Sequence, residues 1–394
     1  MDTAEGEAGT LLRARVAVTT ASWRDALAGR LGDAWEVTLA DDTPDAPLPD
    51  LLVLARETDA SALAVVAGLK RRAATGGARL PLVAPCAADG DPDAPGGMLH
   101  PDALLPVEND GRTGDRLAAV LRASVRLEET ILRHRSLPRL AHDDQPTVPA
   151  SAAHVLVHGD SAALADAARA RGLAIAPHGV LSPEAALARL ETGPADALVL
   201  DAPAARIAHM LEALDRDPRH MHLPTLVIAR DAASRVAALE HGASDVALAE
   251  AAPRDIGRRL QLLLGAQARR RLADARLERF RRSVHDGGDA LAPEDIEAYR
   301  RVLTAALKLR GRAPLEVRLE EVHPGPRELH LANDGIFPPP ARDPVLTTAL
   351  AASREEDFVA RVKGSGGLAI LRDSDALDAL RRRIAAIVDQ TRFG

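Results

Sequence analysis

The sequence is poor in aromatic residues: Phe, Trp and Tyr make up 2% of its 394 residues, whereas all hydrophobic residues together make up 46%. The hydrophobic cores must therefore be built mainly from Ala, Leu and Val. A single cysteine, Cys86, cannot form a disulfide within the chain, which is typical of proteins in reducing compartments.

Long apolar runs are also missing. None reaches the roughly 20 residues needed to cross a bilayer, and the acidic segment 1–9 has no signal-peptide core. The sequence thus predicts a soluble, cytoplasmic protein without membrane insertion. The 50 basic and 57 acidic residues give a net charge of -7 and a pI near 6.0, which argues against a general nucleic-acid-binding protein.

Short apolar runs alternate with helical segments in two successive stretches, residues 13–135 and 153–265. Each stretch predicts a parallel, doubly wound α/β sheet of the flavodoxin-like type. The two units begin about 140 residues apart, and they form an internal repeat. Residues 136–152 between them are rich in Pro, Asp and His, so we expect a linker there.

The second unit carries the clearer motifs. The run Pro194–Asp201 predicts a strand that ends in a carboxylate, and Gly242–Asp245 predicts a turn into the fifth strand. These runs resemble the receiver domains of two-component response regulators. The resemblance implies an acidic pair for Mg²⁺, a phospho-accepting Asp, a Thr or Ser, and a Lys. Asp201 matches the phospho-acceptor.

Most of the residues that this chemistry requires are missing. Asp160 matches one acid, but Gly159 stands in its partner's position, and Ala229 and Ala249 replace the Thr/Ser and the Lys. Asp201 is therefore either a phospho-acceptor or a relic carboxylate at the edge of the sheet. The first unit has lost more, and we interpret it as a docking or dimerisation module; its corresponding residues are Thr19, Thr20, Ala55, Pro85 and Pro106.

A smaller α+β domain is predicted for residues 285–394, after a basic helical linker at 266–284. The pattern of this domain predicts a helix to Leu309, a strand within Pro314–Val322, a helix Pro344–Ser353, a hairpin and a last helix Ser374–Asp389.

The stretch 353–371 decides how this last domain is interpreted. Two apolar strands flank the turn Lys363-Gly364-Ser365-Gly366-Gly367, and Arg354 and Asp357 precede the first strand. This predicts a β-hairpin. The arrangement resembles GGDEF domains, the diguanylate cyclase family, in which an Arg-x-x-Asp pair precedes the glycine turn. A solvated charge pair is the alternative, and the register to Arg361 favours a ligand site.

The resemblance implies a cyclic di-GMP site. Arg354 would donate two hydrogen bonds to O6 and N7 of guanine, and Asp357 would accept from its N1 and N2. Arg361 would contact a phosphodiester. In the family a further arginine on the last helix completes the site; Arg383 matches best and Arg382 second.

The catalytic groups of the family are missing. Active cyclases use metal-bound carboxylates on the first strand and in the turn. The matching positions here are Glu321 and His323 on the strand, and Ser365 and Gly366 in the turn. Because groups that act together have been lost, we expect no turnover, no bound metal and no required cofactor.

The whole domain order, two degenerate receivers and a degenerate GGDEF domain, resembles cyclic di-GMP effectors that act as adaptors in regulated cell-cycle proteolysis. This resemblance implies a homodimer that binds components of protease delivery and is located in the cytoplasm, including at a cell pole. The alternative is a phosphorylation-responsive regulator whose output domain binds protein and no nucleotide.

Overall fold

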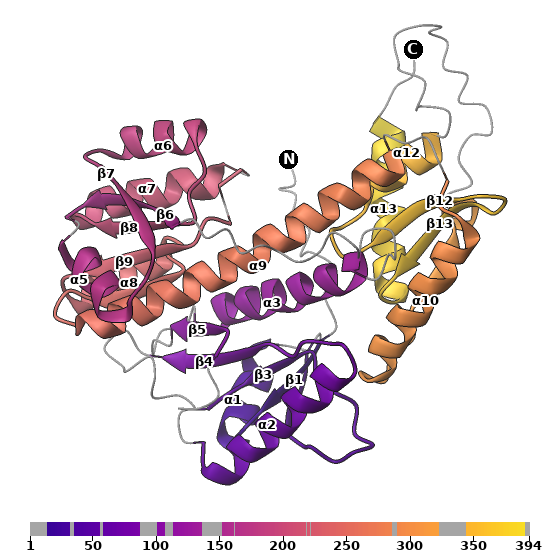
Figure 1. Cartoon of the computed structure of the whole chain (residues 1–394), viewed down its shortest axis with the longest axis horizontal. Coiled ribbons are helices and arrows are strands. Elements are labelled where there is room, and N and C mark those ends of the chain that lie inside the picture. The colour runs from indigo at the N-terminus through magenta and orange to yellow at the C-terminus, as the bar shows by residue number, and fades with distance from the viewer. Residues whose placement is uncertain are drawn as a thin grey trace, which may run out of the picture.

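The computed structural model describes residues 14–31, 35–55, 58–86, 101–106, 113–135, 152–160, 162–217, 219–220, 222–285, 290–322 and 344–390. Two parallel five-stranded sheets are followed by a three-stranded antiparallel sheet (Figure 1). The expected fold class is confirmed: two doubly wound α/β domains precede a smaller α+β domain. We call them the first, second and third domains.

The first domain has the strand order β2-β1-β3-β4-β5, all parallel, which is the flavodoxin-like order. Its central strands are buried, as expected where helices cover both faces of a parallel sheet. The segment 40–50 contains no helix, so β2 and β3 are joined by a loop. The elements are β1 (Ala14–Val18), α1 (Ala21–Leu31), β2 (Trp35–Leu39), β3 (Leu51–Val53), α2 (Ala60–Thr75), β4 (Leu82–Cys86), β5 (Ala103–Pro106) and α3 (Thr113–Arg135).

The second domain repeats this topology with the order β10-β9-β8-β6-β7. Ser182 caps α6 by accepting the N–H of Ala185, and Pro183 occupies the first turn, as its Ser-Pro-Glu start signal predicts. The elements are β6 (Ala153–Gly159), α5 (Ala162–Arg171), β7 (Ile175–Val180), α6 (Pro183–Thr192), β8 (Ala197–Asp201), α7 (Ala204–Arg216), β9 (Thr225–Ala229), α8 (Ala232–Glu240), β10 (Asp245–Leu248) and α9 (Pro253–His285).

Helix α9 differs from the expectation. The sequence suggested a helix ending at Leu264 and a separate linker helix, but α9 runs unbroken for 33 residues. Its two ends are buried by different domains: Leu260 lies in the core of the second domain, and Phe280 lies in the core of the third. This burial at both ends outweighs the cost of about 1 kcal/mol for an interior glycine at Gly265. In Figure 1, α9 reaches from the second domain to the third alongside α3.

The third domain pairs its strands in the order β11-β13-β12, all antiparallel. The predicted hairpin is confirmed, and Gly364 and Gly366 in its turn have φ of 77° and 82°, a region that favours glycine. The expected strand to Val322 is wrong in its second half, because the chain turns into a short helix after Arg318. The elements are α10 (Pro293–Lys308), β11 (Leu315–Arg318), α11 (Leu319–Val322), α12 (Pro344–Ala352), β12 (Phe358–Val362), β13 (Gly366–Leu371) and α13 (Ser374–Gln390).

Three of the scarce aromatic residues meet in the core of the third domain. Phe358 on β12 packs on Tyr299 of α10, with ring centroids 4.4 Å apart, and on Phe280 of α9, at 5.1 Å. All three side chains are buried, and Leu132 of α3 belongs to the same cluster. One core therefore joins the sheet to the last helices of both preceding domains.

Tyr299 is the only tyrosine in the sequence, so its ionisation can be observed directly. Burial raises its pKa from 10.0 to about 12, although the charge of Arg133 opposes the shift. The neutral phenol is thus favoured by folding, and its contribution to stability is complete below pH 10 and is lost as the pH rises towards 12. We expect absorbance at 295 nm to titrate near pH 12 in the native protein and near pH 10 in urea. A native transition near pH 10 would contradict the burial.

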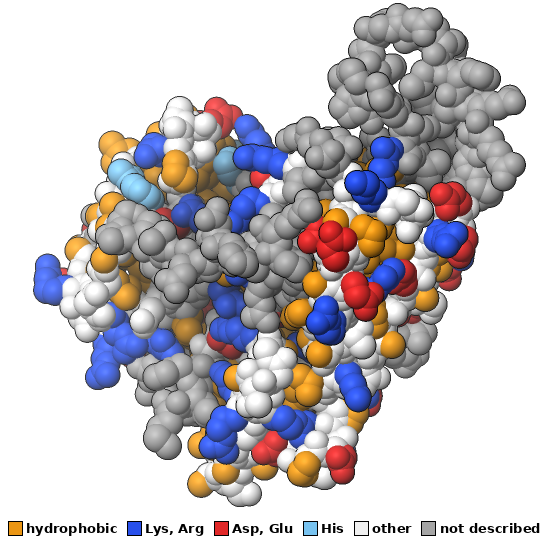
Figure 2. Space-filling model, turned by 45° about the vertical axis from the view of Figure 1, so that its right-hand side comes forward, with side chains coloured by type: hydrophobic (Ala, Val, Ile, Leu, Met, Phe, Trp, Pro, Cys, Tyr) orange, Lys and Arg blue, Asp and Glu red, His pale blue; other side chains and the backbone are white. Residues whose placement is uncertain are grey.

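No helix within the described ranges is long and apolar enough to cross a membrane. On the face shown in Figure 2, basic and acidic side chains of the described surface lie interspersed with hydrophobic ones.

Candidate functional site

The turn between α12 and β12 holds Arg354 and Asp357 in a closed loop of hydrogen bonds. The Arg354 N–H donates to Oδ2 of Asp357 at 2.8 Å, and the Asp357 N–H donates to the Arg354 carbonyl at 3.1 Å. The Asp357 side chain is consequently turned towards the backbone, and the residue is 3% exposed.

Arg383 on α13 lies against the same turn. Its Nη2 is 3.5 Å from Oδ2 of Asp357, and its Nε donates to the carbonyl of Ala352, the last residue of α12. A guanidinium that caps the carboxyl end of a helix is favoured by the helix dipole. Arg354, Asp357 and Arg383 are thus brought together.

Helix α3 of the first domain supplies two further arginines. Arg126 Nε is 3.6 Å from Oε1 of Glu356, and Arg354 Nη1 is 4.0 Å from the same oxygen. Arg133 is 1% exposed, and its Nη1 donates to the carbonyl of Ile370 on β13. The turn 354–357 is therefore enclosed partly by its own domain and partly by the first domain.

The electrostatics of this group, which we call the arginine cluster, favour an anion. Arg126, Arg133, Arg354 and Arg383 surround two carboxylates, those of Glu356 and Asp357. Burial raises the pKa of both carboxyl groups; the arginine charges oppose the shift without cancelling it. Within the cluster, four cations thus face at most two negative charges; the neighbouring carboxylate of Glu129 is paired with Arg372.

Several buried polar atoms of the arginine cluster have no hydrogen-bond partner. They are Nε of Arg126, Nη2 of Arg383 and Oδ1 of Asp357. Unpaired buried donors and acceptors cost free energy, so such a group requires an explanation. A ligand with anionic oxygens and ring N–H groups would satisfy both kinds of atom.

Arg361 lies elsewhere. It is on β12, opposite Gly367 of the hairpin, and it lies four positions after Asp357 along an extended chain, a distance of about 13 Å. It shares a sheet face with Val359 and is half-buried. The structure therefore places Arg361 towards the hairpin tip and away from the arginine cluster.

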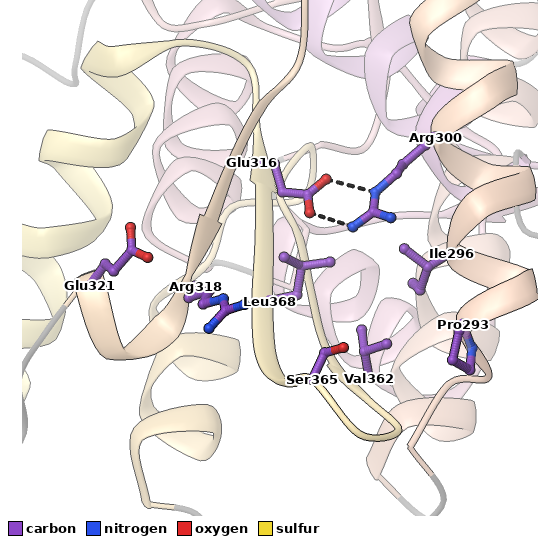
Figure 3. Close-up of a pocket in the computed structure, with 9 residues that line it drawn as sticks. All are labelled: Pro293, Ile296, Arg300, Glu316, Arg318, Glu321, Val362, Ser365 and Leu368. Carbon is purple, nitrogen blue, oxygen red and sulfur yellow. Dashed lines mark hydrogen bonds and ion pairs between the residues drawn. The ribbon is translucent and has the colours of Figure 1, made fainter.

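A cleft of about 370 Å³ lies at that hairpin tip (Figure 3). Arg300 and Glu316 form an ion pair across it, with Arg300 Nε 2.7 Å from Glu316 Oε2. Glu321, Arg318 and Ser365 also line it. Glu321 is on α11 instead of the predicted strand, and His323 lies outside the described residues. No group of three metal-ligating side chains occurs in the described part of the chain.

Asp201 ends β8 at the carboxyl edge of the second sheet, next to Asp160. Burial and the Asp160 charge raise its pKa, and Arg230 opposes the shift. Asp160 Oδ1 already accepts the N–H of Ala162. A Cβ at Gly159, where φ is 111°, would overlap the Asp201 carbonyl oxygen. This backbone therefore has no room for a second acid at position 159.

The chain was compared with known proteins. No family model and no curated protein matches it. Among solved structures, a putative response regulator from Chloroflexus aurantiacus J-10-fl is 22% identical; the match covers 29% of this chain and 98% of that one, with a TM-score of 0.26. A putative two-component system response regulator/GGDEF domain protein is 15% identical, with 65% and 99% covered and a TM-score of 0.26. A response regulator in red light signaling of R. palustris is 17% identical, with 28% and 90% covered and a TM-score of 0.25.

The sequence did not reveal Arg126, Arg133 or Arg230 as members of these sites. Arg126 and Arg133 lie more than 200 positions before the turn that they approach. Their spacing of seven places both on one face of α3, which is the only local signal that could have drawn attention to them.

Proposed function

We propose that this chain is a non-catalytic receptor for cyclic di-GMP, built on the scaffold of a response regulator. The observation that carries the proposal is the arginine cluster, in which buried guanidinium nitrogens and Oδ1 of Asp357 make no hydrogen bond, although Arg126 and Arg383 lie at ion-pair distance from carboxylates. Cyclic di-GMP has two anionic phosphodiesters and two guanines. Its phosphate oxygens suit the arginines, and the N1 and N2 protons of guanine suit Asp357.

A ligand would reach Asp357 past the more exposed side chains of the arginine cluster. The side chains of Arg354 and Arg126 are 22% and 35% exposed, whereas that of Asp357 is 1% exposed. An incoming guanine would draw the Arg354 side chain away from Glu356 and accept its two hydrogen bonds at O6 and N7. Arg361 is best placed as a remote contact to the second half of the ligand.

The same reasoning argues against catalysis. The hairpin turn offers Ser365 and Gly366 where the GGDEF family has acids, and the Arg300–Glu316 ion pair engages a carboxylate that lines the cleft. We therefore propose that the cleft does not assemble the metal site needed for turnover, and that no cofactor is required.

Calorimetry with cyclic di-GMP tests the receptor function on the full chain. We expect binding by the wild type and a loss of affinity of roughly 5- to 150-fold in Arg354→Ala, because one bidentate guanine contact is worth about 1–3 kcal/mol. Lys363→Ala, an exposed cation on the hairpin turn, is the matched control and should bind like the wild type. An intact chain that takes up no ligand would refute the proposal.

Arg383→Ala separates the contribution of α13 to cyclic di-GMP affinity from that of the turn 354–357. We expect an affinity loss of about tenfold, because Arg383 is the cation beside Asp357 Oδ2. Arg381→Ala, two residues earlier on α13 and 45% exposed, is the control. Equal affinities of the two variants would remove Arg383 from the site.

The downstream role that fits such a receptor is that of an adaptor. The domain order resembles that of PopA, a cyclic di-GMP effector in regulated cell-cycle proteolysis. We extend the proposal to a homodimeric cytoplasmic scaffold, found also at a cell pole, that recruits protein partners for protease delivery and binds no nucleic acid.

The second candidate, a phosphorylation-driven regulator, is favoured by the position of Asp201 at the sheet edge. We expect no gain of phosphate mass after incubation with acetyl phosphate and Mg²⁺, because Asp160 stands alone and position 159 cannot carry an acid. A gain of about 80 Da that disappears in Asp201→Asn would support this alternative instead.

A further inference from the structure

Three consecutive arginines at the middle of α9 each bind a different domain. Arg269 forms a bidentate pair with Glu128 of α3, with Nε 2.8 Å from Oε1. Arg270 forms a bidentate pair with Glu355, with Nη1 2.9 Å from Oε2. Arg271 binds Asp196 and donates to the Ala195 carbonyl at 3.0 Å. The first, third and second domains are thus contacted in turn.

This pattern follows from helix geometry. Consecutive residues project about 100° apart around a helix, so three of them cover more than half of its circumference. Three long cations can all be paired only where protein surrounds the helix on three sides. In Figure 1, α9 passes between the second domain and α3 on its way to the third domain.

The partners are themselves fixed in place. Glu128 also accepts Nη1 of Arg79 at 2.7 Å, and its side chain is 7% exposed. Asp196 accepts the N–H of His154 at 2.7 Å through its second oxygen, between β6 and β8. Glu355 differs from both, since it lies in the turn between Arg354 and Asp357 and has 37% of its side chain exposed.

We infer that Arg270 is a positioning residue for the turn 354–357, and that Arg269 and Arg271 tie this turn to the first and second domains through α9. This inference rests on the proposed function, because it takes the turn 354–357 to be part of the ligand site. The Arg270–Glu355 contact would hold that site in place and would couple ligand binding to the first and second domains. Glu355 directly follows Arg354 and lies two positions before Asp357, so a shift of the turn must strain or break its bidentate pair with Arg270.

Arg270→Gln removes the positive charge and the bidentate hydrogen bonding to Glu355 while keeping a long polar side chain. Hydrogen exchange of the turn amides, measured on the full chain without ligand, is expected to rise about five- to tenfold, because the closed loop of bonds at Arg354 and Asp357 loses its anchor. Cyclic di-GMP affinity is expected to fall by a similar factor. Arg282→Gln, which breaks the exposed Arg282–Glu278 pair of the same helix, is the control and should change neither.

The double variant Arg270→Glu with Glu355→Arg restores a pair of opposite charges, and it should recover most of both losses. Unchanged exchange in Arg270→Gln would overturn the inference, as would a charge swap that repairs neither readout. The exchange readout needs no ligand. If wild-type protein failed to bind cyclic di-GMP, the receptor function would therefore be refuted. Hydrogen exchange of the turn amides would still decide whether Arg270 positions the turn.

Discussion

Asp50→Asn is expected to lower the free energy of unfolding by about 3–5 kcal/mol, because it removes a buried countercharge from three arginines, two of which are themselves buried. The Asp50 side chain is 2% exposed and lies in the loop before β3. Arg312 binds it through both terminal nitrogens, at 2.9 and 2.6 Å, and Arg310 and Arg372 each approach to 3.5 Å. The amide of Asn would keep one acceptor oxygen but no charge.

The loss should appear as separation of the third domain from the first. Arg310 and Arg312 follow α10 and Arg372 follows β13, so all three guanidinium groups at Asp50 come from the third domain. A chain of several domains need not unfold in one step, so domain-specific probes are required. The scarce aromatics supply them: both tryptophans, Trp23 and Trp35, are in the first domain, and Tyr299 is in the third. We expect urea to perturb the Tyr299 near-ultraviolet signal at lower concentration in Asp50→Asn than in the wild type.

Glu36→Gln is the matched control. Glu36 pairs with Arg15 at 2.9 Å, but its side chain is 57% exposed, so the variant should cost less than 1 kcal/mol. If the two variants were equally stable, the buried ion cluster could not be what holds the domains together.

The pH dependence of this effect has a definite sign. Burial alone would raise the pKa of Asp50, but the charges of Arg372, Arg312 and Arg310, together with the Arg15 N–H, hold it below its ordinary value of 3.8. A depressed carboxyl pKa stabilises the fold above pH 3.8, and the contribution is lost as the pH falls through the folded value. The difference between wild type and Asp50→Asn should therefore be constant from pH 8 to pH 5 and shrink below pH 4.

The sequence was sufficient for the sheets and the hairpin because their signals are local. Buried runs such as Leu51–Val53 and Ala197–Leu200 identify parallel strands, and the glycine turn identifies the hairpin between β12 and β13. Contacts between domains leave no such pattern. Arg372 binds Glu129 across 243 positions, and neither residue differs locally from any solvent-exposed charge.

The candidate site was likewise predictable only where its residues follow from local signals. The register to the hairpin indicates Arg354 and Asp357, the family resemblance indicates Arg383, and the structure places the three together. Arg361 was selected by the same register, but the rise of an extended strand carries it away from Asp357. Arg126 and Arg270 could not be selected, because their relation to the turn depends on how α3 and α9 pack against the third domain.

Phe358→Ala is expected to destabilise the third domain by about 3–5 kcal/mol, through lost burial and the cavity that remains. Phe358 has no exposed surface, and it is the ring that both Tyr299 and Phe280 contact. Because Phe280 belongs to α9, the cavity would also loosen the end of that helix from the sheet. Phe358→Leu, which retains most of the volume, should cost less than about 1.5 kcal/mol.

Urea unfolding followed by the Tyr299 signal measures this loss, and Val302→Ala provides the control. Val302 is on α10 with 45% of its surface exposed, so its truncation should lie within about 0.5 kcal/mol of the wild type. Phe358 also directly follows Asp357, so loosening of β12 should speed hydrogen exchange in the turn 354–357 as well. A Phe358→Ala protein as stable as Val302→Ala would mean that the three rings do not form the core that fixes α9 to the candidate site.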